Sequence, residues 1–170
     1  MPDIDRIVRV RAATILHQLE VPIVFGTWVM RHREFFLVRI DAESGLTGFA
    51  YGLTRDGPLA AIVDRTIRPQ YVGEPVTDPE ATFHKALWSN NAVHAAGIGM
   101  RALWVVDCAA WDLAAKAAGT NITAYLGGDR ERMPVTGIVG YPPSIGPEAT
   151  VDQIQALWDQ GWRRFKLPIA

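Results

Sequence analysis

The chain has 170 residues, and 49% of them are hydrophobic, which is enough for one domain with a buried core, or for one domain and part of a second. Its 17 Lys and Arg residues and 18 Asp and Glu residues are scattered and leave a net charge of −1, so the basic stripe of a nucleic-acid-binding protein is absent. No apolar run reaches the ~20 residues that cross a bilayer. Because the segment MPDIDRIVRV is charged where a signal peptide is apolar, we expect a cytoplasmic protein without a membrane partner.

The first third of the chain predicts an antiparallel sheet, since segments rich in Val, Ile, Phe and Thr alternate with turn residues. The expected strands are 4–19, 35–40 and 46–52. The turn DAESG joins the last two strands as a hairpin, and the first strand should complete a three-stranded meander. Pro22 and Gly26 are breakers that predict a loop over residues 21–34, although this loop is unusually apolar.

Helical patterns follow the sheet. The expected helices are 59–67, 79–91 and 99–119. Asp78 can cap the second helix, with Pro79 at its first position. The first half of the third helix is apolar nearly all round and should be buried on several sides, while Asp112 and Lys116 form an i,i+4 pair on its more polar side. Residues 68–78 are expected to break the first helix.

In the last 40 residues the predicted pattern changes to alternating strand and helix. The segment MPVTGIVGY predicts a short strand, PEATVDQIQALWDQG an amphipathic helix, and WRRFKLPIA a second strand, which together form a βαβ unit. Such a unit needs a parallel sheet covered on both faces, and so few residues do not supply one. We therefore expect an α+β domain over 1–130 and the truncated beginning of a larger α/β domain over 131–170.

Common catalytic motifs are missing. The segment GIGMRA at Gly97 fits the loose spacing of a nucleotide-binding loop, but no strand precedes it, so a turn between helices is the better interpretation. No serine lies in G-x-S-x-G, and Cys108, the single cysteine, is expected to be a small core residue. The histidines lie on separate segments without metal-ligand spacing and are expected to be surface or packing residues: His17, His32, His84 and His94.

Asp107 lies in the middle of the long apolar helix. A buried carboxylate is costly unless it is paired or well hydrogen-bonded, so this residue has either a structural or a catalytic role. No second acidic residue with a matching role lies near it in the sequence, and we favour the structural role.

Lys166 is the most informative charged residue. Alternation on a strand places Phe165 and Leu167 on one face and Lys166 on the other, so that Lys166 points inward if its neighbours pack against helices. Pro168 cannot donate to a sheet ladder, which puts Lys166 near the end of its strand. An inward residue at the carboxyl end of a barrel strand is typical of an active site.

Three segments resemble the mandelate racemase and muconate lactonizing branch of the enolase superfamily. LVRIDAESGLTGFAYG is similar to the family's hairpin, and ALWVVDCAAWDLAAKAAGTNITAYLGG is similar to its long helix and Leu-Gly-Gly exit. GWRRFKLPIA is similar to its second barrel strand. The resemblance covers essentially the whole chain, and it implies an α+β capping domain followed by the first strand, helix and strand of a β/α barrel.

The resemblance also implies a chemistry, the abstraction of the proton α to a carboxylate, with the enolate stabilised by Mg²⁺. In the family the metal carboxylates lie on the third, fourth and fifth barrel strands, which would fall beyond Ala170. The expectation is therefore a fragment or a natural truncation without its own metal site, which would be inactive alone. The implied partners of the intact protein are a small carboxylate substrate and further copies in a homo-oligomer.

One position departs from the family pattern, in which the second strand commonly ends Lys-x-Lys. Lys166 matches the first lysine, and Pro168 stands at the second, where it cannot move a proton. This disfavours a racemase with two bases and favours a sugar-acid dehydratase, the alternative being a non-catalytic capping or binding module. Lys166 is then expected to serve the substrate carboxylate or the enolate, and not to act as sole base.

The expected substrate-binding residues lie in the N-terminal part of the chain. Exposed apolar side chains in a loop commonly mark a binding surface. We therefore expect the substrate pocket to be capped by Val24, Phe25, Trp28 and Tyr51.

Overall fold

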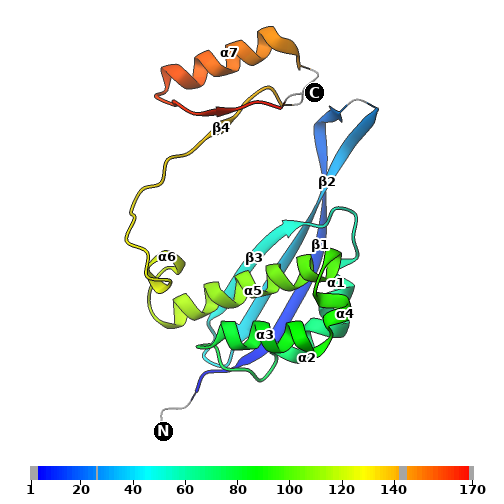
Figure 1. Ribbon diagram of the computed structural model, residues 1–170, viewed down its shortest axis with the longest axis vertical. Helices are drawn as coiled ribbons and strands as arrows, with labels where there is room; N and C mark the ends of the chain where they lie inside the picture. The colour runs from blue at the N-terminus through cyan, green and yellow to red at the C-terminus, as the bar shows by residue number, and fades with distance from the viewer. Residues whose placement is uncertain (1–3, 26, 142–144, 169–170) are drawn as a thin grey trace. The chain divides into compact units, whose positions relative to one another are not determined.

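The computed structural model describes residues 4–25, 27–141 and 145–168 (Figure 1). The chain forms two compact units. The first contains residues 1–16 and 34–129, and the second contains residues 17–33 and 130–170.

A three-stranded sheet with the order β1-β2-β3 forms the base of the first unit, which confirms the expected meander. Its strands are β1 (Ile7–Phe25), β2 (Trp28–Ala42) and β3 (Thr47–Leu53). β2 and β3 pair antiparallel, with Leu37 opposite Tyr51 and Arg39 opposite Phe49. The turn between them contains Gly45 at φ 86°, a conformation that favours glycine.

The predicted loop over 21–34 is wrong. β1 continues through Pro22 to Phe25, and β2 already begins at Trp28, so both strands are long and extend into the second unit. Val and Ile residues on both sides of Pro22 favour an extended backbone, and a proline is tolerated because β1 is an edge strand. Gly26, the other predicted breaker, lies outside the described residues.

Helices cover one face of this sheet (Figure 1). They are α1 (Leu59–Ile62), the π-helical turn η1 (Val63–Ile67), α2 (Arg68–Tyr71), α3 (Pro79–Ser89), α4 (Asn91–His94), α5 (Gly97–Ala117) and α6 (Ile122–Tyr125). The cap of α3 is confirmed, since the Asp78 side chain accepts a hydrogen bond from the Ala81 N–H at 3.0 Å. None of the described helices is long and apolar enough to span a membrane.

The first helical segment does not break at residue 68, contrary to the expectation. It continues to Tyr71, although Pro69 lies within it. The change from π-helical to α-helical geometry puts Pro69 in the first turn of α2, where a missing N–H costs little. Tyr71 is fully buried, so packing also stabilises the extension.

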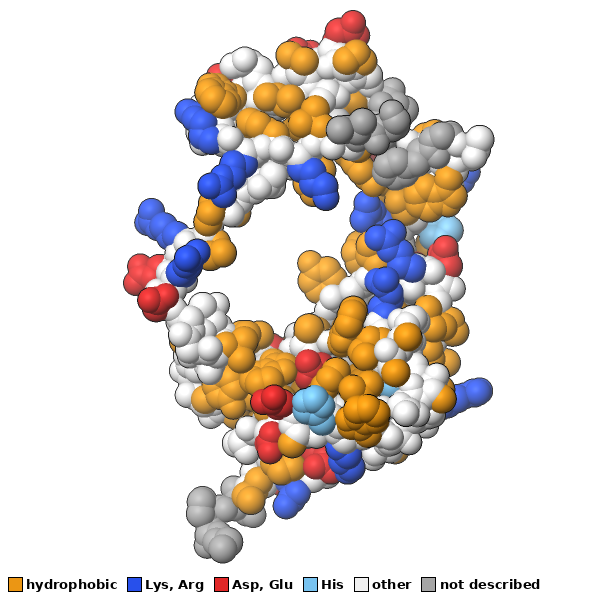
Figure 2. All heavy atoms as spheres, in the orientation of Figure 1, with side chains coloured by type: hydrophobic (Ala, Val, Ile, Leu, Met, Phe, Trp, Pro, Cys, Tyr) orange, Lys and Arg blue, Asp and Glu red, His pale blue; other side chains and the backbone are white. Residues whose placement is uncertain are grey.

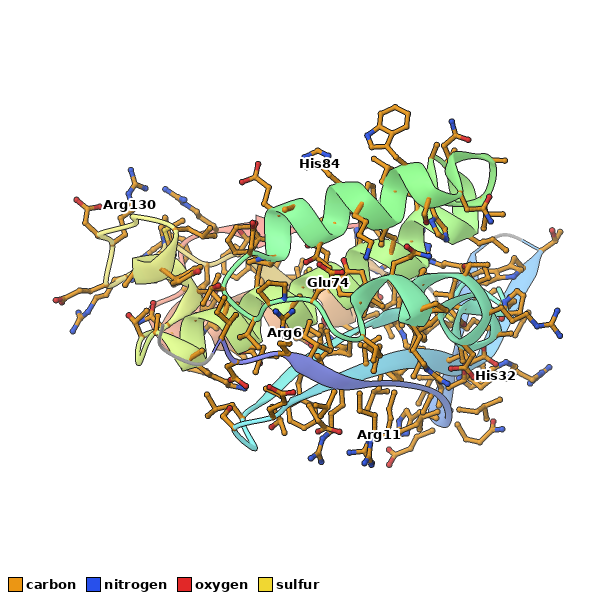
Figure 3. All side chains as sticks on the ribbon, turned by 90° about the horizontal axis from the view of Figure 1, so that it is seen from below. Arg6, Arg11, His32, Glu74, His84 and Arg130 are labelled. Carbon is orange, nitrogen blue, oxygen red and sulfur yellow. The ribbon has the colours of Figure 1, made fainter. Side chains whose placement is uncertain are left out.

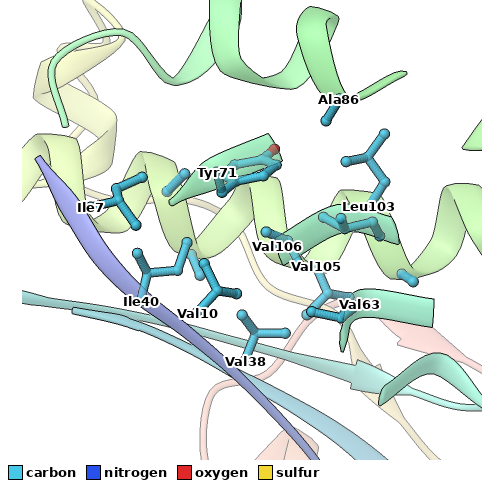
Figure 4. Packing of buried hydrophobic residues seen from close by; sticks show 14 of the residues in the cluster. Ile7, Val10, Val38, Ile40, Val63, Tyr71, Ala86, Leu103, Val105 and Val106 are labelled. Carbon is cyan, nitrogen blue, oxygen red and sulfur yellow. The ribbon is translucent and has the colours of Figure 1, made fainter. Parts of the chain in front are cut away.

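The core of the first unit lies between the sheet and the helices (Figure 4). Phe36, Val38 and Ile40 point from β2 into it, as the alternation of a half-covered strand requires. Helix α5 packs closely on β3 because Gly48 has no side chain. A Cβ at this position would overlap the Ala109 carbonyl oxygen and lie 2.8 Å from the Leu113 Cβ.

Cys108 is exposed, not a core residue as expected. Trp104, one turn before it on α5, is 58% exposed. Both residues lie on the side of the helix away from the buried stripe. An apolar pattern all round a helix does not show which side packs on the sheet, and this caused the error.

The second unit contains a βαβ arrangement, which confirms the expected start of a β/α fold. β4 (Gly137–Ile138) pairs parallel with β5 (Phe165–Lys166), and α7 (Gly146–Asp159) connects them. A Cβ on Gly137 would lie 3.3 Å from Leu157 of α7 and 3.5 Å from the Phe165 ring. The helix therefore covers the face of the pair that carries Phe165.

Candidate functional site

Lys166 is exposed and lies at the end of β5, in register with the exposed Ile138 of β4. Phe165 lies on the face that α7 covers, and Leu167 lines a hollow together with Val151 and Ile154 of that helix. Alternation therefore puts Lys166 on the face of the strand pair opposite α7. Pairing ends at Lys166, two residues before Pro168. The ammonium group can offer a positive charge to an anion on that face.

The tip of the β1–β2 hairpin carries three of the predicted pocket residues. Val24 is half-buried, Trp28 is 51% exposed, and the side chain of Phe25 lies outside the described residues. Trp28 and its neighbour Val29 present apolar surface. The tip and Lys166 belong to the same compact unit.

Tyr51 is 76% exposed and lies in the first unit. It is opposite Leu37 of β2, which alternates with the buried Phe36 and Val38, so both Leu37 and Tyr51 are on the face of the sheet away from the core. Figure 3 shows the helices of this unit on the other side of the sheet. Its ring is 6.5 Å from the Phe35 ring, measured between centroids. The structure thus groups Tyr51 with residues of β2.

A strained turn follows β3, and the sequence analysis missed it. The Gly57 N–H donates to the Thr54 carbonyl at 3.2 Å, and the two residues between them, Arg55 and Asp56, have φ angles of 55° and 61°. Two positive φ angles define a type I′ turn, which normally prefers Asn or Gly. Strain of this kind concentrates at functional sites. The segment TRDG carries a turn signal in its Asp-Gly pair, but the positive φ at Arg55 has no sequence signature.

Asp107 has a strongly perturbed carboxyl group. Burial raises its pKa to about 6, while the Trp111 indole and the nearby His84 oppose that rise. Its buried Oδ1 atom has no hydrogen-bond partner among the described residues, and the same holds for the hydroxyl of Tyr71. Burial raises the pKa of Tyr71, and the nearby Asp107 charge raises it further.

Asp112 and Lys116 act together on the free edge of β3. The Asp112 carboxylate accepts a hydrogen bond from the Phe49 backbone N–H at 2.8 Å, and the Lys116 ammonium donates to the Thr47 carbonyl at 2.9 Å. The two side chains also bond to each other at 2.6 Å. The predicted i,i+4 pair is therefore present, and it caps the backbone groups of an edge strand, which the helical spacing alone did not reveal.

The histidines have the packing and surface positions expected of them. His94 is fully buried and makes hydrogen bonds to the Ala86 carbonyl at 2.7 Å and to the Thr66 hydroxyl at 2.9 Å. The other three are exposed. Figure 2 shows one face of each unit, on which charged side chains of both signs lie among exposed hydrophobic ones.

The described residues contain no group of three or more His, Cys, Asp or Glu side chains that could hold a metal ion. The donor set that Mg²⁺ prefers is therefore not assembled in this part of the chain. What the described residues can do chemically is to bind an anion at Lys166 and to supply apolar cover at the hairpin tip.

Residues 7–127 match the family model of the mandelate racemase/muconate lactonizing enzyme N-terminal domain. The chain belongs to this family. The match covers the three-stranded sheet and the helices from α1 to α6, and it confirms the resemblance seen in the sequence.

Relatives of this family with different activities are similar to the chain. N-succinylamino acid racemase of Thermus thermophilus is 30% identical over 95% of this chain and 44% of its own length. L-talarate/galactarate dehydratase of Salmonella typhimurium is 30% identical over 49% of this chain and 21% of its own length.

Solved structures of the superfamily share the fold. A racemase from Streptomyces coelicolor with bound magnesium has a TM-score of 0.84 and 26% identity, over 96% of this chain and 46% of its own. The Salmonella dehydratase also has a TM-score of 0.84, at 22% identity, over 98% of this chain and 44% of its own. The chain thus spans about half the length of the relatives it matches.

Proposed function

We propose that the whole protein abstracts the proton α to the carboxylate of a sugar acid and eliminates water from it. The family and its enzyme relatives support the proton abstraction. The observation that carries the choice of a dehydratase is Pro168, two residues after Lys166, because a proline there removes a second base from this strand. Sugar-acid dehydratases are among the relatives, as are racemases and o-succinylbenzoate synthases.

Magnesium is part of this proposal, since similar structures contain it. When bound, Mg²⁺ stabilises the negative charge that develops on the carboxylate oxygens as the proton leaves. The described residues do not form a set of metal ligands, so the residues that would hold Mg²⁺ are proposed to lie outside this part of the chain.

The domain boundary belongs to the same proposal. We place an N-terminal capping domain at 1–130 and the beginning of a C-terminal β/α barrel at 131–170. Two observations support this boundary: the family match ends at residue 127, and the first compact unit ends at Asp129. The parallel pairing of β4 with β5 across a helix is what the first two strands of a barrel require.

Lys166 is proposed to bind the substrate carboxylate or the enolate. Its place opposite α7 supports this role, because the face of a barrel strand opposite the helices is the barrel interior. The ammonium group is a compact charge that attracts an anion, and the enolate carries more charge on its carboxylate oxygens than the substrate does. We propose that Lys166 holds that charge and does not act as sole base.

The substrate pocket is proposed to be capped by Val24, Phe25, Trp28 and Tyr51. The exposed apolar surface of Trp28 supports its part in this cover, and Tyr51 is the most exposed aromatic residue of β3. A cap of this kind would exclude water from the reacting carbon, which strengthens each electrostatic contact there.

Product analysis with a panel of acids tests the proposal. The natural polypeptide that contains these 170 residues, at its full length and with Mg²⁺, is incubated with galactarate, L-talarate, mannonate and galactonate, and separately with N-succinylamino acids. We expect a keto acid from at least one sugar acid and no inversion of the N-succinylamino acids. Racemisation without dehydration would contradict the choice of a dehydratase. A well-folded protein that converts none of these acids would favour the non-catalytic binding module.

A further inference from the structure

The strained turn after β3 is anchored at both ends by buried residues. Thr54 and Leu59 are fully buried, and the Leu59 N–H donates to the Gly57 carbonyl at 2.8 Å. Between these anchors, Arg55 and Asp56 are exposed and have φ angles of 55° and 61°. Residues other than glycine persist in this conformation only where the surrounding structure imposes it. The strain must therefore be held by contacts of the anchoring residues.

A chain of two hydrogen bonds runs from this turn to β2. The Asp56 backbone N–H donates to the Thr54 hydroxyl at 3.2 Å, and that hydroxyl donates to the Glu34 carboxylate at 2.5 Å. A hydroxyl that donates to a carboxylate becomes a better acceptor, so the second bond strengthens the first. The Thr54 N–H also donates to the Glu34 carbonyl at 3.1 Å. Glu34 therefore holds Thr54 by backbone and side chain, and Thr54 holds the second strained residue.

The end of the turn packs closely on the start of α5. A Cβ on Gly57 would lie 3.1 Å from the Ile98 Cγ2 atom and 3.2 Å from the Thr54 carbonyl oxygen. A larger residue at Gly57 would have little room there. The backbone of the turn is thus fixed by the hydrogen bonds from Glu34 and by the contact with Ile98.

The residue types in the turn indicate more than a connection between β3 and α1. A type I′ turn is free of strain when Asn or Gly occupies its two central positions. Arg55 and Asp56 occupy them here, and neither side chain makes an ion pair or a hydrogen bond among the described residues. Strain that is kept at exposed charged residues favours a functional role for the turn.

We propose that Glu34 is a positioning residue of the substrate cover and acts through Thr54 on the turn 54–57. This inference rests on the proposed function, in which Tyr51 of the same strand caps the substrate. Glu34 also follows directly on the hairpin segment 17–33, which carries the other proposed cover residues. A turn that is rigid before the substrate arrives loses little conformational entropy on binding. Its guanidinium and carboxylate offer a donor and an acceptor to the hydroxyl groups of a sugar acid.

Steady-state kinetics of the full-length polypeptide test this role. Glu34→Met removes the acceptor at similar side-chain length, and Glu34→Gln keeps an acceptor. We expect Glu34→Met to raise KM for a converted sugar acid about tenfold and to change kcat less than about threefold, because the turn contacts the substrate away from the reacting carbon. Glu34→Gln should restore most of the affinity. A merely structural role would lower kcat, since fewer molecules are folded, and leave KM unchanged.

Glu74→Met is the matched control. Glu74 lies in the same unit, is half-buried like Glu34, and also accepts a hydrogen bond at 2.5 Å, in this case from Lys85. We expect no change of KM in this variant.

A comparison of two residues at position 55 tests the strain itself and needs no substrate. Glycine adopts a positive φ freely and alanine does not, so Arg55→Gly should have a higher urea midpoint than Arg55→Ala. Glu131→Gly and Glu131→Ala are the control pair, since Glu131 is exposed and has no positive φ, and here alanine should have the higher midpoint. The advantage of glycine at position 55 should shrink in a Glu34→Met background, where the turn can relax. It should persist in a Glu74→Met background.

Circular dichroism shows whether each variant is folded. If Glu34→Met is not, Thr54→Val replaces it in both tests, with Thr82→Val as its control. Thr82 is also buried, and its hydroxyl donates to the Asp78 carbonyl at 2.9 Å.

Three results would overturn the inference. They are an Arg55→Gly midpoint no higher than that of Arg55→Ala, a glycine advantage that loss of the Glu34 acceptor leaves unchanged, and an unchanged KM for Glu34→Met. The proposed function is judged separately, by whether the wild-type protein converts a sugar acid. If it converts none, the proposed function fails and the role in substrate cover fails with it, while the urea comparison still decides whether Glu34 holds the strained turn.

Discussion

The environment of Asp107 disfavours the charged form of its carboxyl group. Burial raises its pKa from 3.8 to about 6, so the folded chain binds a proton there more readily than the unfolded chain does. Above pH 6 the carboxylate is charged in both states, and its poor solvation lowers the free energy of unfolding. As the pH falls from 6 to 4, the folded state takes up the proton first, and this destabilisation disappears.

Replacing Asp107 by Asn should therefore stabilise the protein at high pH. The pKa shift corresponds to about 3 kcal/mol at most, and water access to a half-buried side chain reduces this to about 1–2 kcal/mol at pH 8. Urea unfolding at pH 8 and at pH 4.5 measures the effect. The gain should be absent at pH 4.5, and the exposed control Asp129→Asn should show no such dependence. An Asn variant that is less stable at pH 8 would show that the charge is required for packing.

Lys166 is the residue on which the proposed substrate contact depends. In the full-length polypeptide, Lys166→Met should lower kcat/KM by about 10²-fold or more, because a charged contact to the developing enolate is lost. Lys166→Arg keeps the charge and should retain part of the binding. Steady-state kinetics of both variants on any sugar acid that the protein converts are the measurement. Unchanged turnover and affinity for Lys166→Met would refute the assignment.

Among elements, the contact between α5 and β3 depends on one glycine. Gly48→Ala should lower the free energy of unfolding by about 3 kcal/mol or more, because its Cβ would overlap the backbone of α5 and no side chain can move aside. Gly52→Ala on the same strand is the matched control. Its Cβ would meet only a methyl group of Val105, at 3.1 Å, and the expected cost is about 1 kcal/mol or less. Equal losses in urea unfolding would contradict this account.

The edge of β3 gives a second test of the same contact. Asp112→Ala removes the acceptor of the Phe49 N–H and the partner of Lys116. A hydrogen bond to a charged group contributes about 1.5–3 kcal/mol, and partial exposure lowers the expected loss to about 1–2 kcal/mol. Asp159→Ala on α7 is the control, since its side chain is exposed and accepts a hydrogen bond from Gln155 on the same helix. Amide exchange should accelerate at Phe49 in the first variant and not in the second.

The helices and strands were predictable where local chemistry decides them. The Asp78 cap, the turn at Gly45 and the helix expected from residue 59 follow from residue types at fixed spacing. The prediction of a loop at Pro22 was wrong, because the tolerance of a proline depends on whether its strand lies at the edge of a sheet. The prediction of a buried Cys108 was also wrong, because neighbouring elements decide which side of an apolar helix is packed.

At the scale of the whole molecule, the family and the order of the elements followed from the sequence, and the arrangement of the candidate site did so only in part. Alternation around Lys166 predicted which face of β5 it occupies. Two features could not be predicted from residue spacing along one helix or strand. One is the strained turn at Arg55 and Asp56. The other is the capping of β3 by Asp112 and Lys116, which depends on contacts between distant segments.

We propose that residues 1–170 contribute a cap and a barrel start to a dehydration that other residues complete. Incubation of a converted sugar acid in D₂O with Mg²⁺ tests it most directly, comparing the full-length polypeptide with a chain of residues 1–170. Loss of the α-hydrogen and of the β-hydroxyl as water leaves an enol, which takes one deuterium at the former β-carbon as it becomes the keto acid. We predict this singly deuterated keto acid from the full-length polypeptide and no reaction from residues 1–170. Turnover by residues 1–170 alone, or recovered acid with deuterium and inverted configuration at the α-carbon, would contradict the claim.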